Sequence, residues 1–262
     1  MAQTSTSPAV GRSLDVLTYL AGRPGPVPGS AIVRDLDLPR SSTYHLLQVL
    51  IDRGFVVHYP EERTYALGVA AFEIGSAYLR HGPLEHRGRP LVRRLATTLS
   101  ETAHLGILHG SETLYLLKEQ PAEGIPVTLV TDVGVRLPAS LTATGRSILA
   151  HLSPAQVRAL FPDDASLVLR TTSGPARRTD LVTLLRSERR QGWSEEDGMV
   201  TAGLRSVAAC AFDHTGHPVA AFSVTWRADR ARSSYEAVVA GVRSAARDLT
   251  TALSGVAPAG WF

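Results

Sequence analysis

The sequence has little or nothing of several features that would define its class. Its single cysteine, Cys210, excludes an internal disulfide and a metal site built from several thiolates. It lacks an uninterrupted apolar run of about 18 residues, so we expect no transmembrane helix. The first residues, Met1 to Gly11, are small and polar, without the basic start and apolar run of a signal peptide. These absences predict a cytoplasmic protein.

Net positive charge is also small, and the positive residues are almost all arginine, because Lys118 is the only lysine. The 262 residues carry a net charge of only +3, and in the first 82 residues seven arginines are balanced by seven acidic residues. If this first segment binds DNA, the positive charge must therefore be local. The length allows two modest domains, and the hydrophobic content of 44% is ordinary for a globular chain.

The first 68 residues contain three helical patterns followed by two β-prone runs, after a tail over 1–9 that we expect to be disordered. We predict helices over 10–20, 30–36 and 39–53 and strands over 55–59 and 64–68. Ser30 is the expected N-cap of the second helix, and Pro39 suits the first turn of the third. Between them, Asp37 tolerates a left-handed backbone better than most residues. Three helices followed by a hairpin are typical of a winged helix-turn-helix.

The third of these helices is the candidate DNA-reading helix, because the second helix of a helix-turn-helix enters the major groove. Its apolar positions must face the core, which leaves hydrogen-bonding side chains on the opposite face. The candidate DNA-binding residues are Arg40, Ser41, Ser42, Tyr44, His45, Gln48 and, at the hairpin tip, Arg63. Any surface helix has a polar outer face, so the tight turn before this helix and the hairpin after it carry the interpretation.

The rest of the chain mixes helices with strands. After a helix over 69–80, a second domain begins near Leu84 with a helix that holds Leu91, Leu95 and Leu99. Further helices are expected near 144–152, 154–160, 177–191 and 234–253, and strands near 103–109, 112–119, 126–131, 192–197, 203–212 and 218–226. Helices combined with an antiparallel-looking sheet predict an α+β sensor domain.

Several motifs, taken in their order and spacing from about residue 9 to 254, resemble the IclR family of bacterial transcription regulators. They lie at Arg12–Leu17, Leu38–Thr43, Leu46–Leu47, Tyr65–Gly68, Gly134–Pro138, Ala143–Arg146, Gly203–Ala209 and Ala220–Val224. The resemblance implies a winged helix-turn-helix DNA-binding domain over 9–68, a linker helix over 69–83 and a GAF-like effector-binding domain over 84–255. It also implies dimers that pair into tetramers and, by the habit of the family, repression more often than activation.

The same resemblance implies an effector pocket between the loop that enters a helix and the strands that face it. The implied residues are Ala143, Thr144, Glu196, Ser206, Ser223 and Thr225, with Pro126 at the edge. Thr144 and Gly145 open a helix, so N–H groups can face a carboxylate, and hydroxyls two apart on a strand share a face. A small organic acid or hydroxy acid is therefore the expected effector.

Some residues leave alternatives open or depart from the family. Arg136 is either a counter-ion for an anionic ligand or part of a surface salt bridge. Hydroxyls at alternate strand positions also often just face solvent. Trp226 has the opposite strand parity to the pocket hydroxyls and is expected to pack on the other face. The family usually has Arg at His45 and Gly at Asp37, and members with keto-acid ligands often have Asp at Glu196.

Enzyme and metal interpretations have weaker support. Neighbouring carboxylates at 195–197 point to opposite faces of a strand, which predicts a solvated strand end rather than an acid/base pair. Cys210, His214 and His217 suggest a metal site, but 213–218 is typical of a hairpin turn. We therefore expect no enzyme, no cofactor and no metal, and as partners operator DNA, a small-molecule effector and a second copy of the chain, but no membrane. The alternative is a metabolite-binding protein or enzyme that acts without DNA.

Overall fold

The computed structural model describes residues 7–81, 83–121, 131–231, 233–259 and 261. The chain divides into two compact units, over 1–82 and 83–262, and each is described by itself. Among the helices of the described residues, none is both long and apolar enough to cross a membrane.

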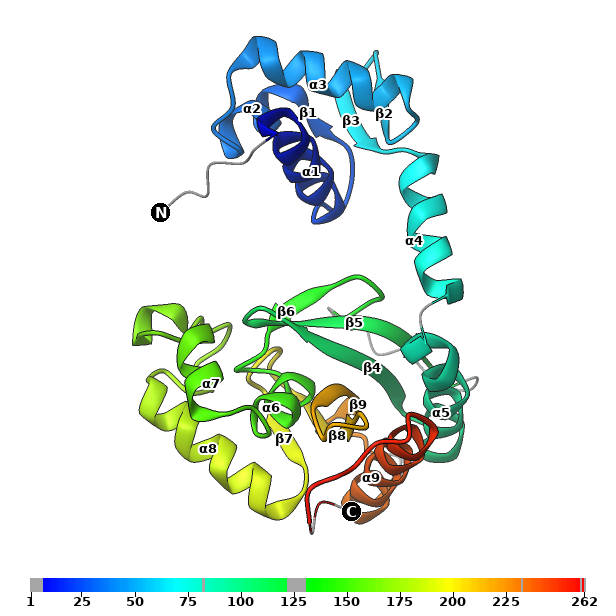
Figure 1. The fold of residues 1–262 in the computed structure, drawn as a ribbon, viewed down its shortest axis with the longest axis vertical. Coiled ribbons are helices and arrows are strands. Elements are labelled where there is room, and N and C mark those ends of the chain that lie inside the picture. Colours follow the sequence, from blue (N-terminus) through cyan, green and yellow to red (C-terminus); the bar gives the residue numbers. More distant parts are fainter. Residues whose placement is uncertain (1–6, 82, 122–130, 232, 260, 262) are drawn as a thin grey trace. The chain divides into compact units, whose positions relative to one another are not determined.

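The first unit is a helical layer with a small sheet (Figure 1). Its elements are α1 (Pro8–Ala21), β1 (Val27–Pro28), α2 (Gly29–Asp35), α3 (Arg40–Asp52), β2 (Val56–Tyr59), β3 (Thr64–Leu67) and α4 (Val69–His81). The strands are antiparallel in the order β1-β3-β2. Apolar side chains of α1, α2, α3 and the hairpin close one core, which includes Val16, Ile32, Leu47 and Val56. This is the winged helix-turn-helix that the sequence predicts.

Two helix starts and one additional strand in this unit differ from expectation. Helix α1 begins at Pro8, inside the expected tail, since proline is tolerated in a first helical turn. Helix α2 begins at Gly29 with Pro28 as its N-cap, so Ser30 is not the cap. The residues before it form β1, an edge strand that the Gly/Pro-rich composition concealed. A β-carbon on Gly29 would lie 3.0 Å from side-chain atoms of Tyr44 and Tyr65, so glycine permits this close packing.

The connection into α3 has the backbone that the sequence predicts. Asp37 has φ +50°, in the left-handed region. Pro39 is the N-cap of α3 rather than its first residue. The tight turn therefore fixes where the helix starts, and with it the orientation of its outer face.

The second unit is built on one six-stranded antiparallel sheet in the order β6-β5-β4-β9-β8-β7 (Figure 1). Its helices are α5 (Pro83–Leu99), α6 (Ala143–Leu149), α7 (Pro154–Leu160), α8 (Arg178–Gln191) and α9 (Tyr235–Ala252), with a short 3₁₀ turn over Asp164–Ser166. Its strands are β4 (Thr102–His109), β5 (Glu112–Glu119), β6 (Arg136–Pro138), β7 (Ser194–Asp197), β8 (Leu204–Phe212) and β9 (Pro218–Arg227).

The two faces of this sheet have different chemistry. One face packs on α5 and α9 through a large apolar cluster that includes Leu105, Val207, Phe222 and Val224. Trp226 belongs to this cluster, which confirms the predicted strand parity. The other face meets α6 and carries the polar positions of β7, β8 and β9. The result is an α+β domain. One face of its sheet is apolar and covered by two helices, and the other is polar and lies under one short helix.

Strand β6 was missed, because three residues ending in proline carry no alternating pattern. The strand expected over 126–131 lies outside the described residues except for Thr131, which is not in a strand.

A buried ion pair joins α6, α8 and β7. The Arg146 guanidinium and the Glu188 carboxylate are almost fully buried and lie 2.9 Å apart. The guanidinium also donates to the carbonyls of Ser140, Leu141 and Glu195, and to the sulfur of Met199. One side chain of α6 thus holds a loop, a neighbouring helix and an edge strand.

Removing the carboxylate should destabilise the second unit strongly. Glu188→Gln leaves the Arg146 charge buried without its counter-ion, so we expect a loss of about 3–5 kcal/mol in the free energy of unfolding. Glu112→Gln is the matched control, because its pair with Arg136 (3.7 Å) is partly exposed and should contribute at most about 1 kcal/mol. Urea unfolding followed by tryptophan fluorescence reports this unit alone, since Trp193, Trp226 and Trp261 all lie in it. Equal losses in both variants would contradict the role of the pair.

Candidate functional sites

The outer face of α3 presents the predicted polar residues. Thr43, Leu47 and Leu50 are buried. The exposed residues of the helix include Arg40, Ser41, Tyr44, His45 and Gln48, whereas Ser42 is half-buried.

Two of these side chains already have contacts. The Arg40 guanidinium lies 5.9 Å from the Tyr44 ring centre, and Gln48 donates to Asp52 (2.8 Å). Cation, hydroxyls, imidazole and amide thus share one accessible face, and this is the chemistry that contacts phosphates and base edges.

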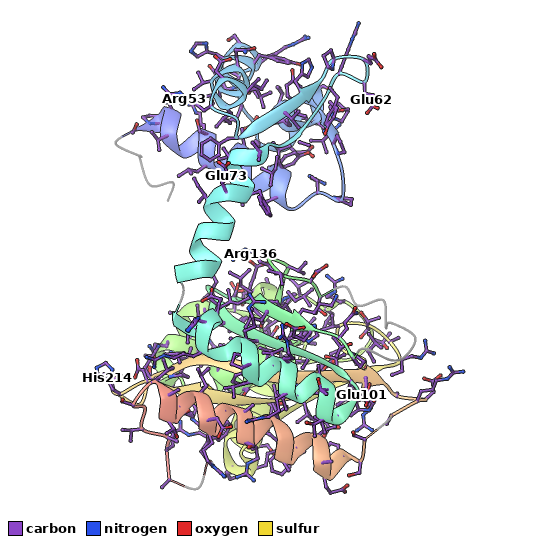
Figure 2. The ribbon with its side chains drawn as sticks, turned by 90° about the vertical axis from the view of Figure 1, so that its right-hand side faces the viewer. Arg53, Glu62, Glu73, Glu101, Arg136 and His214 are labelled. Atoms are coloured by element: carbon purple, nitrogen blue, oxygen red, sulfur yellow. The ribbon has the colours of Figure 1, made fainter. Side chains whose placement is uncertain are left out.

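The hairpin that follows α3 carries mixed charge at its tip. Arg63 is exposed and has φ +53°, a left-handed backbone that turns the chain between β2 and β3. Glu61 and Glu62 are exposed beside it, and Figure 2 labels Glu62 at the tip. The tip therefore offers one cation flanked by two anions.

In the second unit, the start of α6 is held in place by two threonines. Thr142 is the N-cap, and its hydroxyl accepts from the Gly145 N–H (3.0 Å) and contacts the Thr113 hydroxyl (2.7 Å). A β-carbon on Gly145 would lie 2.4 Å from the Thr113 hydroxyl and 2.5 Å from Ala139. Glycine at this position lets the helix start press against the sheet.

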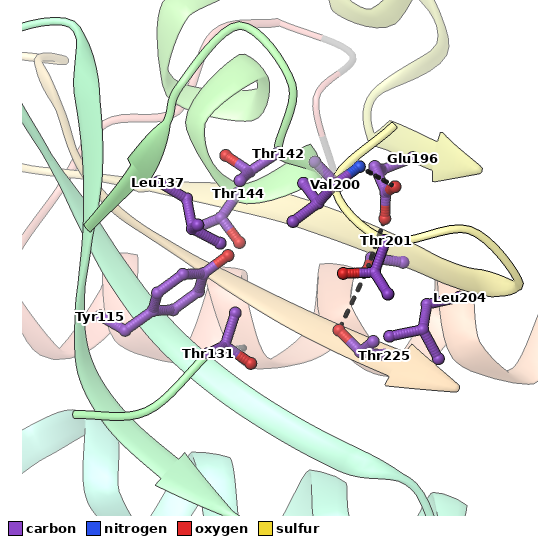
Figure 3. Close-up of a pocket in the computed structure, with 12 residues that line it drawn as sticks. Tyr115, Thr131, Leu137, Thr142, Thr144, Glu196, Val200, Thr201, Leu204 and Thr225 are labelled. Carbon is purple, nitrogen blue, oxygen red and sulfur yellow. Dashed lines mark hydrogen bonds between the residues drawn. The ribbon is translucent and has the colours of Figure 1, made fainter. Parts of the chain in front are cut away.

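A cavity lies beside this helix start, between α6, the sheet and the turn after β7 (Figure 3). It brings together five of the predicted pocket residues, namely Ala143, Thr144, Glu196, Ser206 and Thr225. Its volume is about 30 Å³, room for a water molecule or two. A metabolite would therefore have to widen it.

Glu196 is the chemical centre of the cavity wall. Its carboxylate accepts from the backbone N–H groups of Met199 (2.7 Å) and Val200 (3.1 Å) and from the Ser206 hydroxyl (3.2 Å). Ser206 in turn contacts the Thr225 hydroxyl at 3.0 Å. Burial raises the pKa of Glu196 despite these hydrogen bonds. The cavity therefore contains a carboxyl group that is easier to protonate than an exposed one.

The expected solvated strand end is wrong for Glu196, which is only 3% exposed. Its hydrogen bonds with the N–H groups of residues 199 and 200 hold that turn over the strand, and the turn shields the carboxylate from solvent. Asp197 is exposed, and Glu195 lies on the opposite face, where it pairs with Arg205.

Three predicted pocket residues are not among those that line the cavity. Ser223 is buried on the cavity side of the sheet, between Ala208 and His104 in the register, but it does not line the cavity. Arg136 is exposed (Figure 2), with His109 at 2.7 Å and Glu112 at 3.7 Å. Of the two roles considered for Arg136, the structure thus shows the surface salt bridge. The neighbouring Leu137 is the β6 residue that faces the cavity, so Arg136 points to the other side. Pro126 lies outside the described residues.

No cation occurs among the described residues that line the cavity, since none of them is Arg, Lys or His. His104, which contacts Thr131 (3.0 Å) at the cavity edge, is neutral, because burial lowers its pKa to about 3. An anionic ligand would therefore rely on hydroxyls, backbone N–H groups and a protonated Glu196.

Sequence reasoning missed several lining residues. They are Tyr115, Thr131, Leu137, Thr142, Val200, Thr201 and Leu204. Tyr115 lies two residues from Thr113 on β5, so by strand alternation both side chains are on the face that meets α6 and the cavity. A signal did exist for Thr142, because a threonine three residues before Gly145 at a helix start is typical of an N-cap.

The segment Asp213–Pro218 connects β8 to β9 as a turn, as predicted. The Asp213 carboxylate accepts from the Thr215 hydroxyl (2.7 Å) and from the His217 and Thr215 N–H groups (3.0 and 2.8 Å), and these hydrogen bonds lower its pKa to about 2. Cys210 is buried in β8. No cluster of three or more potential metal ligands occurs among the residues that the structure describes.

Comparison with known proteins gives the same two-part division of the chain. Residues 9–60 match the family profile of the IclR helix-turn-helix domain, and residues 76–251 match that of the C-terminal part of the bacterial transcriptional regulator IclR.

Individual relatives cover nearly the whole chain. The HTH-type transcriptional regulator BhcR of Paracoccus denitrificans is 32% identical over 95% of this chain and 88% of its own length. The transcriptional repressor IclR of Escherichia coli is 29% identical over 96% of this chain and 94% of its own. The crystal structure of an IclR homolog from Microbacterium hydrocarbonoxydans, complexed with 4-hydroxybenzoate, has a TM-score of 0.75 at 25% identity. It covers 94% of this chain and 98% of its own.

Two buried histidines should make stability fall as the pH falls. Burial lowers the pKa of His104 to about 3, with Lys118 adding to the effect and Asp132 opposing it. Burial and Arg189 lower the pKa of His151, packed edge-on against Phe212 and Trp261, to about 4. Both values lie below the ordinary 6.5, so the unfolded chain takes up protons that the folded chain does not.

This stabilisation is present above pH 6.5 and is lost as the pH falls toward the folded pKa values. Between pH 7.5 and 5 the free energy of unfolding should drop by about 2 kcal/mol for His104 and somewhat less for His151. Urea unfolding at both pH values checks this. His104→Asn should reduce the drop by about 2 kcal/mol, and His214→Asn, in the exposed 213–218 turn, should leave it unchanged. An unchanged drop in His104→Asn would refute the assignment.

Proposed function

The chain belongs to the IclR family of bacterial transcription regulators and is a DNA-binding regulator, and from this premise we propose that it is a repressor controlled by a small-molecule effector. Several similar proteins are named repressors, among them the transcriptional repressor IclR and the repressor AllR of Escherichia coli, which favours repression. We further propose that the DNA-binding domain spans 9–68, the linker helix 69–83 and the effector-binding domain 84–255.

The exposed polar face of α3 is the observation that carries the DNA-binding part of this proposal. This face begins directly after the tight turn, at the N-terminus of α3. It carries Arg40, Ser41, Tyr44, His45 and Gln48. We assign base-edge and phosphate contacts to these residues and to Ser42. Arg63 at the hairpin tip would contact the flanking backbone.

Self-association is supported by apolar side chains that the first unit leaves uncovered. Val10 and Leu14 of α1 are more than half exposed, as are Val69, Phe72 and Ile74 of α4. A single unit rarely leaves so many large apolar groups in water, and a second copy of the chain would bury them. A two-fold dimer also fits the need to read two half-sites of a pseudo-palindrome. Pairing of dimers into tetramers is proposed on the family habit alone.

Loss of Arg40 should weaken binding to the operator. In a gel-shift titration with the region upstream of the chain's own gene, at physiological salt, Arg40→Ala should cost about 1–3 kcal/mol, or roughly 5- to 150-fold in affinity. Arg53→Ala is the matched control, because Arg53 is exposed at the opposite end of α3. Unchanged affinity in Arg40→Ala, or a chain that stays monomeric in solution and on DNA, would contradict this assignment.

The cavity under α6 is the proposed effector site. Its hydroxyl groups from Thr142, Thr144, Ser206 and Thr225 fit a small ligand with several hydrogen-bonding groups. The IclR homolog bound to 4-hydroxybenzoate makes a hydroxylated organic acid a reasonable class to test. Since Glu196 is part of the wall and no cation occurs among the described lining residues, a carboxylate ligand should bind together with a proton.

A metabolite that fills this cavity should change DNA affinity. Thermal-shift screening of carboxylated and hydroxylated metabolites, followed by DNA titration with each hit, should reveal a change of about 5- to 150-fold, typical of coupling between sites. Thr144→Val and Thr225→Val should abolish the thermal shift, whereas Thr251→Val, exposed on α9, should not.

For an anionic hit, binding should tighten from pH 7.5 to 5.5, and Glu196→Gln should remove that pH dependence. If a metabolite still produced its thermal shift in both Thr144→Val and Thr225→Val, this cavity would be excluded as the effector site. A hit that binds tightly but leaves DNA affinity unchanged would exclude the coupling.

A further inference from the structure

A second hollow in the effector-binding unit lies between α7 and α8, at the end of α6 farthest from the cavity described above. Its volume is about 560 Å³, within the range of small-molecule sites. The apolar surface comes from Leu149 and Ala150 of the α6 end, Val157 of α7, and Val182 and Leu185 of α8. The two hollows share no lining residue, so they are separate sites.

Arginine dominates the polar part of this groove. Arg158 of α7 and Arg178, Arg186 and Arg189 of α8 line it, and no acidic residue does. Among the described residues, the side chains of Arg158, Arg186 and Arg189 form no ion pair or hydrogen bond. Only Arg178 has a partner, the carbonyl of Pro162 (2.8 Å).

The acidic residues of α8 are committed elsewhere. Asp180 pairs with Arg177 (3.2 Å), and Glu188 is buried against Arg146. Nothing on the helix therefore neutralises the groove.

Helix-end electrostatics explain only part of this arrangement. Arg158 and Arg189 lie in the last turns of their helices, where cations are favourable, but Arg186 does not. Arg186 and Arg189 are three apart on one helix face, where like charges destabilise each other. A bound anion would relieve this repulsion, and its apolar body would cover the floor that the two helices leave open.

We propose that this groove binds an amphipathic organic anion, a free small molecule with one carboxylate or similar head group and an aliphatic or aromatic body. The head group pairs with Arg186 and Arg189, and the body packs on Val157, Val182 and Leu185. Bidentate guanidinium contacts suit a planar carboxylate, and the apolar floor selects against small inorganic anions. This site goes beyond the proposed effector cavity, whose described lining has hydroxyls and a carboxyl group but no cation.

Decanoate is a suitable probe, titrated calorimetrically into the full chain below its micelle-forming concentration. A ligand of this size in a fitting groove should bind with a Kd of about 1 mM or tighter. Arg186→Gln combined with Arg189→Gln should weaken binding by about tenfold or more. Arg170→Gln combined with Arg190→Gln is the matched control, because it removes the same charge from exposed arginines outside the groove. Circular dichroism verifies that all variants fold.

Several outcomes would overturn the proposal. Equal weakening in the control pair would reduce the effect to overall charge. Equally tight binding of decylammonium would show that only the apolar body is recognised. Loss of decanoate binding in Thr144→Val combined with Thr225→Val would place the probe in the effector cavity instead. Finally, absent binding together with a change of oligomeric state in the Arg186/Arg189 variant would make the groove a contact between copies of the chain.

Discussion

The second unit, over 83–262, depends on the buried contact between Arg146 and Glu188. One guanidinium on α6 connects α8 through the carboxylate, β7 through the Glu195 carbonyl, and the loop before α6 through two further carbonyls. The loop, the start of α6 and β7 are also walls of the cavity proposed as the effector site. Arg146 does not itself line the cavity, yet it sets the distances between the residues that do. Removing two charges from water costs free energy, and here the resulting contacts fix three elements in one arrangement.

The two ends of α6 meet opposite chemistry. At its start, capped by Thr142, the cavity offers hydroxyls and the Glu196 carboxyl, with a neutral histidine nearby. At its end, the groove between α7 and α8 offers arginines over an apolar floor. The arginine that separates them, Arg146, is neutralised by Glu188 and contributes net charge to neither. The second unit therefore has two hollows of opposite chemistry, which we propose select ligands by different physical means.

In the DNA-binding unit, position matters more than quantity of charge. Arginines and acids balance over this segment, but Arg40 lies on the exposed face of α3 while Asp35 is engaged by Arg23, Arg34 and Tyr19. Two residues other than glycine, Asp37 and Arg63, adopt left-handed backbone at the turn before α3 and at the hairpin tip. These two strained points orient the reading helix and the wing, the parts of the unit assigned to DNA.

The sequence by itself determined the order of elements except for the short strands β1 and β6, because apolar periodicity, turn residues and strand parity are local properties. These local properties predicted the winged helix-turn-helix, the outer face of α3 and the 213–218 turn. They also predicted that Trp226 packs on the sheet face opposite the cavity. Only the tertiary structure decided which polar groups meet. It excluded Arg136 from the cavity, buried Glu196 beneath the 199–200 turn, brought Tyr115 of β5 to the cavity wall, and left three arginines around a groove with no partner among the described residues. Such encounters join residues far apart in the chain, so their geometry depends on packing between elements, which no local pattern encodes.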